Sequence, residues 1–415
     1  MSLAIRENVL GLEHPDVAQS LNNRAALLES EGKYAAAKLL YERSLAIREK
    51  ALGPDHPAVA TALNNRAGLL STQGMYDEAG PLYARAIAIQ EKALGSKHPD
   101  LAVWLNNRAG LLRAQGKYAE AEPLYARCQA IQEKVLGPEH PSLATTLSNR
   151  AGLLRVQGKY DEAERFYGRS LAIREKVLGP EHPDVAASLN NRAELLRMQG
   201  KYGEAEPLYK RSQAIREKAL GPGHPDVAQS LNDRALLLSA QAKYAEAQPL
   251  FERALAINEV ALGVDHPSTI TSRAKMADLY TKQGFLDKAS PLLEEVVSAR
   301  ERAFGRDHPD VASALNDRAG LLRAQGKYAE ADPQYLRAIE IGEKTLGPDH
   351  PLLATWLNNR ARLLESQGKH NEAIPLLKRA SSIRRKKLGD NHHSTVDSQI
   401  SLERVQKYVR DYETY

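Results

Sequence analysis

Hydrophobic residues recur at helical spacing along almost the whole chain, and the pattern returns every 42 residues. One copy, PDVAASLNNRAELL, spans residues 183–196. On a helix that turns by about 100° per residue, Val185 and Leu189 fall on one narrow apolar arc. Asn191 and Arg197 fall on a different, mixed face of amides, small residues and charges. The pattern predicts a helix that packs through one face and leaves the other available to a ligand.

A second hydrophobic segment follows in every unit, after a turn of the QGKY type. In the same unit, Leu208 and Ile215 belong to its apolar stripe. Pro183 suits the first turn of a helix, where its missing N–H costs nothing, and Gly200 suits a helix end, where glycine tolerates a positive φ. Each unit is therefore predicted to be a pair of α-helices. Most second segments also carry a proline near their start, where it removes at most one hydrogen bond: Pro81, Pro123, Pro207, Pro249, Pro291, Pro333 and Pro375.

A His-Pro dipeptide marks the start of each unit, and no insertion or deletion interrupts the spacing. The dipeptides begin at His14, His56, His98, His140, His182, His224, His266, His308 and His350. The sequence thus predicts a partial repeat at residues 1–13, the end of a second helix. Nine 42-residue units follow at 14–391, and then a degenerate C-terminal capping helix at 392–415. The partial repeat is either an amino-terminal cap or part of a longer array, and we favour the longer array.

The seventh unit departs from the others. Ala274 and Lys275 replace its pair of asparagines, Met276 replaces the arginine that follows them, and Leu293 replaces a tyrosine. Its apolar pattern survives, so we expect the array to continue through it while the polar face changes. Its polar residues Lys275, Asp278 and Lys282 are expected to lie at the surface.

Composition narrows the function classes. Lys and Arg total 57 against 52 Asp and Glu, and the charges are interspersed, which is typical of solvated helix faces and not of a nucleic-acid patch. The single cysteine, Cys128, excludes an internal disulfide, and we expect it to be a small residue at a tight helix crossing. No long apolar run or signal core occurs, which favours a cytoplasmic protein without a membrane span.

Several motifs carry a family resemblance. The loop LGPDHP, the Asn-Asn pair before an alanine, and EAEPLY followed by RAxAIxEK resemble the 42-residue tetratricopeptide repeats of kinesin light chains. The signature small and aromatic positions of the family match Ala67, Gly74, Tyr76, Ala79, Tyr83 and Ala86 in the second unit and their equivalents in the other units. The resemblance covers about residues 2–391. It implies an all-α, right-handed superhelix (an α-solenoid) of about nine helix-turn-helix repeats.

The resemblance also implies a function. The chain is expected to be a non-catalytic protein–protein interaction scaffold whose concave groove binds extended peptide segments, like the cargo-binding domain of kinesin light chains. The alternative is a sensor or regulatory arm of a larger signalling protein with a nucleotide-binding NTPase domain. Neither a heptad coiled coil nor a GxxxxGK[ST] phosphate loop is present in this sequence. The partner, the oligomeric state and any self-association stay open.

Amides and arginines on the polar face are the candidate ligand-binding groups. An amide can grip a peptide backbone whatever its side chains, and the family implies this role for the second asparagine of the pair. Arginine follows one turn later in three consecutive units, which favours an acidic peptide as the ligand. The candidate residues are Asn106, Asn107, Arg113, Asn149, Arg155, Asn190, Asn191 and Arg197. Amides that join neighbouring helices, or a solvated face without a partner, are the alternatives.

Other repeated residues receive structural interpretations. The arginine of NNRA falls at the edge of the core, where we expect its stem to pack and its guanidinium to meet a carboxylate or a helix-end carbonyl. Recurring glycines, such as Gly110 and Gly320, indicate close backbone approach or inheritance by duplication. Successive histidines lie about one helix width or more apart, too far to share a metal. No cofactor, metal site or catalytic group is predicted, because residues copied in every unit form ladders and not one convergent site.

Overall fold

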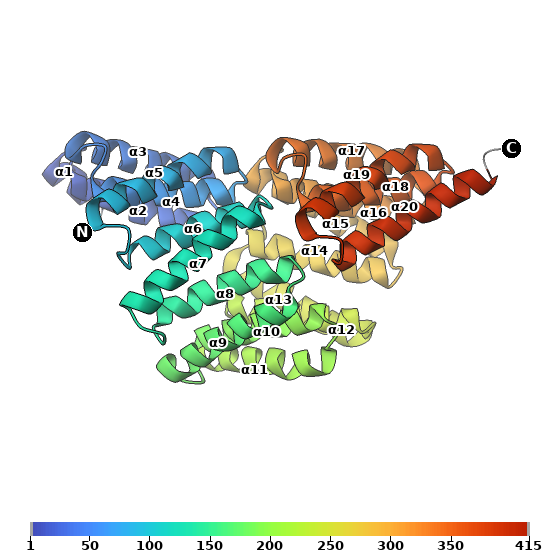
Figure 1. Cartoon of the computed structure of the whole chain (residues 1–415), viewed down its shortest axis with the longest axis horizontal. Coiled ribbons are helices and arrows are strands. Elements are labelled where there is room, and N and C mark those ends of the chain that lie inside the picture. The colour runs from blue at the N-terminus through green and yellow to red at the C-terminus, as the bar shows by residue number, and fades with distance from the viewer. Residues whose placement is uncertain (1–2, 413–415) are drawn as a thin grey trace. The chain divides into compact units, whose positions relative to one another are not determined.

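The computed structural model describes residues 3–412, and in this range the chain consists only of helices and the turns that join them (Figure 1). The first helices of the pairs are α2 (Pro15–Ser30), α4 (Pro57–Thr72), α6 (Leu101–Ala114), α8 (Pro141–Val156), α10 (Pro183–Met198), α12 (Pro225–Ala240), α14 (Pro267–Lys282), α16 (Pro309–Ala324) and α18 (Pro351–Ser366). The second helices are α3 (Tyr34–Leu52), α5 (Tyr76–Leu94), α7 (Tyr118–Val135), α9 (Tyr160–Leu178), α11 (Tyr202–Leu220), α13 (Tyr244–Leu262), α15 (Leu286–Phe304), α17 (Tyr328–Thr345) and α19 (His370–Leu388). Helices α1 (Leu3–Leu10) and α20 (His393–Tyr412) flank the pairs. The predicted all-α fold of repeated helix pairs is confirmed.

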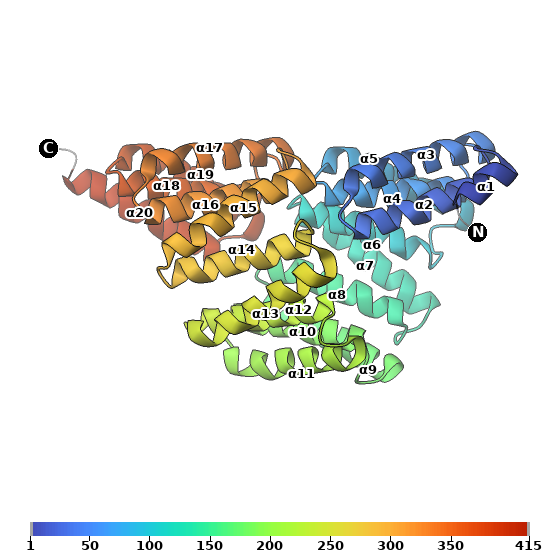
Figure 2. The ribbon, with the colours of Figure 1, turned by 180° about the vertical axis from the view of Figure 1, so that it is seen from behind.

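The chain divides into two compact units. One ends at Asn149 and the other begins at Arg150, so the division falls inside α8. Within each unit, a first helix packs against the second helix of its own pair and against the second helix of the pair before it. The ribbon seen from the two sides shows these neighbours together (Figures 1 and 2).

The core of each pair is completed by the pair that follows it. In the second compact unit, Ala193 and Leu196 of α10 meet Ala205 and Tyr209 of α11, and Leu237 of α12 closes the cluster. Alanine at the crossing points lets the helices approach closely, while tyrosine fills the remaining space. The same cluster recurs in the first compact unit as Ala67, Leu70, Ala79, Tyr83 and Leu111. No pair buries its apolar face alone, as expected of a repeat array.

The repeated histidine caps most of the first helices, although α6 begins later, with Asp100 at its N-cap. At the start of α10, the backbone N–H of Asp184 donates to Nδ1 of His182 over 3.1 Å, and Pro183 occupies the first helical position. The cap satisfies one N–H that has no partner inside the helix. The expected place of the histidines in the turns between units is thereby confirmed. The same bond occurs at His14, His56, His224, His266, His308 and His350.

The arginine of the NNRA segment joins its first helix to the second helix of the preceding pair. Nε of Arg192 lies 2.6 Å from a carboxylate oxygen of Glu164 on α9, the second helix of the preceding pair. Arg360 likewise pairs with Asp332 at 2.8 Å. The predicted structural role of this arginine is confirmed, and an ion pair at the edge of the core explains why a charge is tolerated there.

Second helices are joined by a ladder of ion pairs. Each link connects an arginine to a glutamate of the preceding second helix, as Arg211 does with Glu175 at 2.8 Å. The other links are Arg43–Glu7, Arg85–Glu49, Arg127–Glu91, Arg253–Glu217, Arg337–Glu301 and Arg379–Glu343. These partly exposed pairs each contribute about 0–1 kcal/mol. In the seventh unit Glu295 replaces the arginine and pairs with Arg302 on its own helix instead.

Cys128 is a structural residue. Its thiol is buried and donates to the carbonyl oxygen of Ala102 over 3.1 Å, as the hydroxyl of Ser212 does to Ala186 over 2.8 Å. Burial raises the pKa of the thiol to about 11, although a hydrogen bond with Thr146 lowers it somewhat. The cysteine therefore takes the place of serine at a helix crossing, as the sequence predicts.

One turn contains a strained residue that yields a prediction. Ala242 has φ 57° where the equivalent Gly200 has φ 74°. A side chain in this left-handed conformation costs about 1 kcal/mol, so Ala242→Gly should raise the free energy of unfolding by about that amount in urea denaturation. Gly200→Ala is the matched control and should lower the free energy of unfolding similarly, because it places a side chain in the same left-handed conformation. A Cβ there meets no atom within 4 Å, so no steric clash adds to this effect. An unchanged or lower stability of Ala242→Gly contradicts this account.

Candidate functional site

The candidate residues occupy equivalent positions on the first helices, and we call the surface that these positions form within each compact unit the first-helix face. In the fifth repeat it consists of Asn190, Asn191, Glu194 and Arg197 of α10, together with the hydroxyl of Tyr209 from α11. The equivalent positions of the other repeats belong to the same face. Its side chains are mostly partly buried.

In the first compact unit the asparagines form a hydrogen-bonded ladder. Nδ2 of Asn107 donates to Oδ1 of Asn64 in the repeat before it, over 3.0 Å. Asn149 donates to Asn106 in the same way over 3.1 Å. Within the second repeat, Asn64 donates in turn to Asn65 over 3.2 Å. These amides thus join neighbouring first helices, the alternative that the sequence leaves open, and much of their hydrogen-bonding capacity is already used.

The ladder changes direction in the second compact unit, where aspartates replace two of the asparagines. Nδ2 of Asn190 donates forward to Asp233 over 2.8 Å, because a carboxylate can only accept. Nδ2 of Asn359 still donates backward to Asn316, over 2.9 Å. Asn191 is partly buried on the same helix as Asn190 and also has an interaction partner.

Two of the candidate arginines share a carboxylate. Arg197 donates two hydrogen bonds of 2.7 Å to Glu194, and a nitrogen of Arg155 lies 3.9 Å from the same group. Tyr209 donates to Glu194 as well, over 3.0 Å. Burial would raise the pKa of Glu194, but the bonds and charge of Arg197, with those of Tyr209 and Arg155, hold it below its usual value. The cluster keeps one net positive charge.

Arg113 stands in a different environment. No carboxylate pairs with it within residues 3–412, and its charge lies near Tyr118 and Tyr125. Burial raises the pKa of both tyrosine hydroxyls, while the charge of Arg113 lowers it. On the first-helix face of the first compact unit, Arg113 therefore carries a positive charge that no carboxylate of the described residues balances.

Tyrosine hydroxyls are part of this face, which the apolar periodicity of the second helices hides. Tyr125 places its hydroxyl beside Gly110, 3.8 Å from where a Cβ would be, and Tyr335 does the same at Gly320. Where glutamate takes the glycine position, as at Glu194, the tyrosine hydroxyl bonds to it. Comparison of the copies shows that the glycine or glutamate of the first helix and the tyrosine of the second helix always occupy the same two repeat positions. That comparison could have identified the tyrosine hydroxyls as part of the face.

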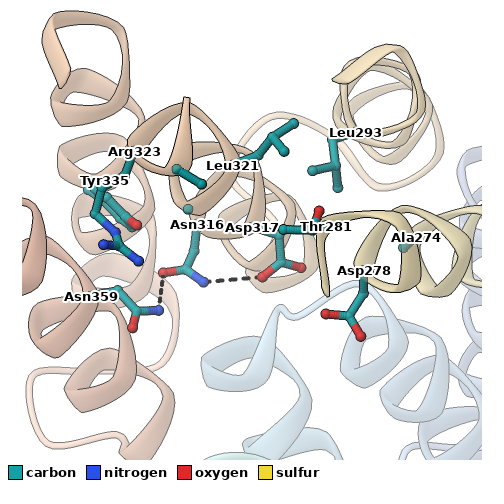
Figure 3. Close-up of a pocket in the computed structure, with 12 residues that line it drawn as sticks. Ala274, Asp278, Thr281, Leu293, Asn316, Asp317, Leu321, Arg323, Tyr335 and Asn359 are labelled. Carbon is teal, nitrogen blue, oxygen red and sulfur yellow. Dashed lines mark hydrogen bonds between the residues drawn. The ribbon is translucent and has the colours of Figure 1, made fainter. Parts of the chain in front are cut away.

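A pocket of about 340 Å³ opens on the face in the seventh and eighth repeats. Polar groups from α14, α16, α17 and α18 line it (Figure 3). They are Asp278, Thr281, Asn316, Asp317, Arg323, Tyr335 and Asn359. Asp278, expected to be an ordinary surface residue, lines this pocket, and it also pairs with Lys282 at 2.7 Å. The remaining lining is small or apolar, with Ala274 and Leu293 at two positions where this repeat lost an amide and a tyrosine.

Neither a metal centre nor a membrane helix is found in the described part of the chain. Between residues 3 and 412, no three His, Cys, Asp or Glu side chains are grouped closely enough to hold a metal ion. None of the helices in that range is both long and apolar enough to cross a membrane.

Comparison with family models decides the family. Models described as tetratricopeptide repeat match residues 17–58 and a series of overlapping segments from 40–92 to 310–386. The chain belongs to the tetratricopeptide repeat family. Tetratricopeptide repeats generally form non-catalytic scaffolds for protein–protein interaction and bind protein or peptide partners. A comparison with curated proteins gave no match.

Solved tetratricopeptide repeat structures resemble the chain to different degrees. A putative kinesin light chain from Podosopora anserina with nearly identical repeats is 29% identical, over 50% of this chain and 98% of that one, with a TM-score of 0.42. A Rap protein complexed with Competence and Sporulation Factor is 14% identical over 85% and 99%, with a TM-score of 0.52. The apo form of RapI is 14% identical over 69% and 98%, with a TM-score of 0.50. The two Rap structures share the fold of this chain.

The glycines of the first-helix face allow a test of why they recur. Gly110→Ala should raise the free energy of unfolding by about 0.5–1 kcal/mol, because the new Cβ fits 3.8 Å from the Tyr125 hydroxyl. Gly342→Ala is the contrasting control, since its Cβ would lie 2.3 Å from the ring of Trp356 and must destabilise. Chemical denaturation measures both. A destabilised Gly110→Ala would show that packing within the chain requires the glycine.

The cluster around Glu194 predicts a pH dependence. Glu194→Gln should lower the free energy of unfolding by about 1 kcal/mol at neutral pH, because the charge-assisted bonds to Arg197 are lost. The lowered pKa means that this stabilisation is complete above the unfolded pKa near 4.5 and disappears as the pH falls through the lower folded value. Urea denaturation of both proteins at several pH values checks this. A difference that grows on acidification contradicts it.

Proposed function

We propose that the chain is a non-catalytic interaction scaffold whose first-helix face binds extended, acidic segments of partner proteins. It needs no cofactor and binds neither nucleic acid nor membrane, and we place it in the cytoplasm. The observation that carries this proposal is the positive charge of Arg113, which no carboxylate of the described residues neutralises.

Charge on the second helices differs from charge on this face. On the second helices, arginines such as Arg85 and Arg127 are already paired with glutamates of the neighbouring repeat. A ligand gains little from such groups because it must displace an existing partner. Arg113 has no such partner, and the cluster of Arg155, Arg197 and Glu194 has one cation in excess.

Hydrogen-bonding groups beside these charges support the binding of an extended backbone. The hydroxyl of Tyr125 and the small Gly110 lie next to Arg113, and asparagine amides continue along the face. The amides already join the helices, so they are held in fixed orientations. A ligand that bonds to their remaining lone pairs pays little ordering entropy on the protein side.

A charge reversal tests the proposal. A fluorescent peptide of alternating glutamate and serine should bind the wild-type chain, and Arg113→Glu should weaken it about tenfold because attraction becomes repulsion. Lys97→Glu is the matched control, since it makes the same charge change in the turn before α6, where the side chain is exposed. Fluorescence anisotropy at low and high salt gives both affinities.

A control peptide and added salt test whether charge drives the binding. A peptide in which glutamine replaces glutamate must bind much more weakly, and added salt must reduce binding of the acidic peptide. Equal binding to the wild type and Arg113→Glu would discard the acidic-segment proposal. A pull-down from lysate followed by peptide-array mapping would then supply the sequences that do bind.

A further inference from the structure

The amide ladder stops at the seventh repeat and leaves a carboxylate without its usual neighbour. Ala274 stands where the preceding repeats have Asn190 and Asn232. Asp317, one repeat later, occupies the position from which an asparagine would donate to that missing amide. Asp317 instead accepts a hydrogen bond from Nδ2 of Asn316 in its own repeat, over 3.2 Å. Asp317 therefore faces the space that Ala274 leaves empty (Figure 3).

The same position in the sixth repeat shows which chemistry such a carboxylate accepts. Asp233 receives the amide of Asn190 and also lies 3.6 Å from the ammonium of Lys275. Lys275 comes from the following repeat and is only partly exposed. The residue equivalent to Lys275 for Asp317 is Asn359, whose amide donates to Asn316 instead. Asp233 thus has an ion-pair partner at 3.6 Å, whereas Asp317 has no ion pair among the described residues.

The pocket around Asp317 has room for a cation from elsewhere. Its volume of about 340 Å³ exceeds the size of a single side chain, and Asp278 adds a second carboxylate across from Asp317 (Figure 3). The neighbouring positive charges are engaged with other groups. Lys282 pairs with Asp278, Arg323 shares a hydrogen bond with Tyr335, and Arg300 donates to the backbone oxygen of Asp310 over 2.8 Å.

We propose that this pocket binds a positively charged side chain, lysine or arginine, of a partner polypeptide, with Asp317 as the counter-charge. The inference rests on the proposed function, because it takes the first-helix face to be the surface that receives the partner. It adds that a partner presents a basic residue to the second compact unit, at the seventh and eighth repeats. The ion pair between Lys275 and Asp233 is an example of this contact within the chain.

The electrostatics of Asp317 agree with this role. Its side chain is accessible from the pocket, yet the surrounding protein displaces much of its water and raises its pKa to about 6. The bond from Asn316 and the charge of Arg300 on α15 lower this pKa, whereas Asp278 on α14 raises it. Binding of a cation needs the ionised carboxylate. Affinity should therefore fall when the pH is lowered from 7 to 5, because the ionised fraction of Asp317 falls.

The test uses a neutral-ended peptide, acetyl-Gly-Gly-Lys-Gly-Gly-amide, with arginine and glutamine versions, in a ligand-observed NMR titration of the full chain. The cationic peptides should bind saturably at pH 7 and the glutamine peptide should not. Asp317→Asn should weaken binding about tenfold or more, as expected for one charge-assisted contact. It should fold, because asparagine occupies this position in most repeats.

Two further variants keep the test specific. Asp233→Asn makes the same substitution at the same repeat position, where Lys275 already occupies the carboxylate, and should leave peptide binding unchanged. Asn359→Lys copies the arrangement of Lys275 and should fill the pocket from within, which abolishes peptide binding and raises the melting temperature. Circular dichroism confirms that all three variants are folded.

Defined results overturn the inference. Three results would each reject the pocket as the binding site. They are no saturable binding of either cationic peptide, equal binding of the glutamine peptide, and equal losses of affinity in Asp317→Asn and Asp233→Asn. The acidic peptide and Arg113 take no part in this titration. If only the acidic-segment proposal fails, the cationic peptides still bind. If only the pocket fails, Arg113→Glu still weakens the acidic peptide.

Discussion

No helix pair of this protein can bury its apolar face alone, and the rest of the structure depends on this constraint. Tyr209 and Leu196 of one pair are covered only when Leu237 of the next pair packs on them. The array is therefore stabilised by neighbours, and the same side chains recur because each interface must fit the next. The amide ladder and the ion pairs of the second helices add polar contacts between the same neighbours. Because these contacts are copied, each departure from the copy marks a position with a different role.

Departures from the copy account for the chemistry of the first-helix face. Arg113 lacks the carboxylate that Arg197 finds in Glu194, and Asp317 lacks the lysine that Asp233 finds in Lys275. In both comparisons one repeat provides the partner internally and another leaves the charge for a ligand. For each candidate contact, the chain thus contains one repeat in which the charge has an internal partner and one in which it does not. A protein without repeats does not offer this comparison.

The fold could be predicted from the sequence because local signals agree with one another. His182 and Pro183 start α10, Gly200 lies in the turn after it, and the brace at Arg192 follows from the cost of a bare charge near the core. The candidate site was harder. An amide bonds equally well to a ligand or to another amide, so the sequence could not assign Asn107 to either role. The pocket depends on what is missing, since Ala274 and Leu293 create space only once their neighbours are placed.

The break in the amide ladder also bears on how the second compact unit opens. Asn190 and Asp233 lie on one side of Ala274, and Asn316 and Asn359 lie on the other, each pair coupled by its own bond. Stability in a repeat array is a sum of local terms and nearest-neighbour couplings. The seventh and eighth repeats lack this bond, so we expect the coupling between them to be weaker than between repeats that have it. The pocket would then lie where local opening of the array costs least.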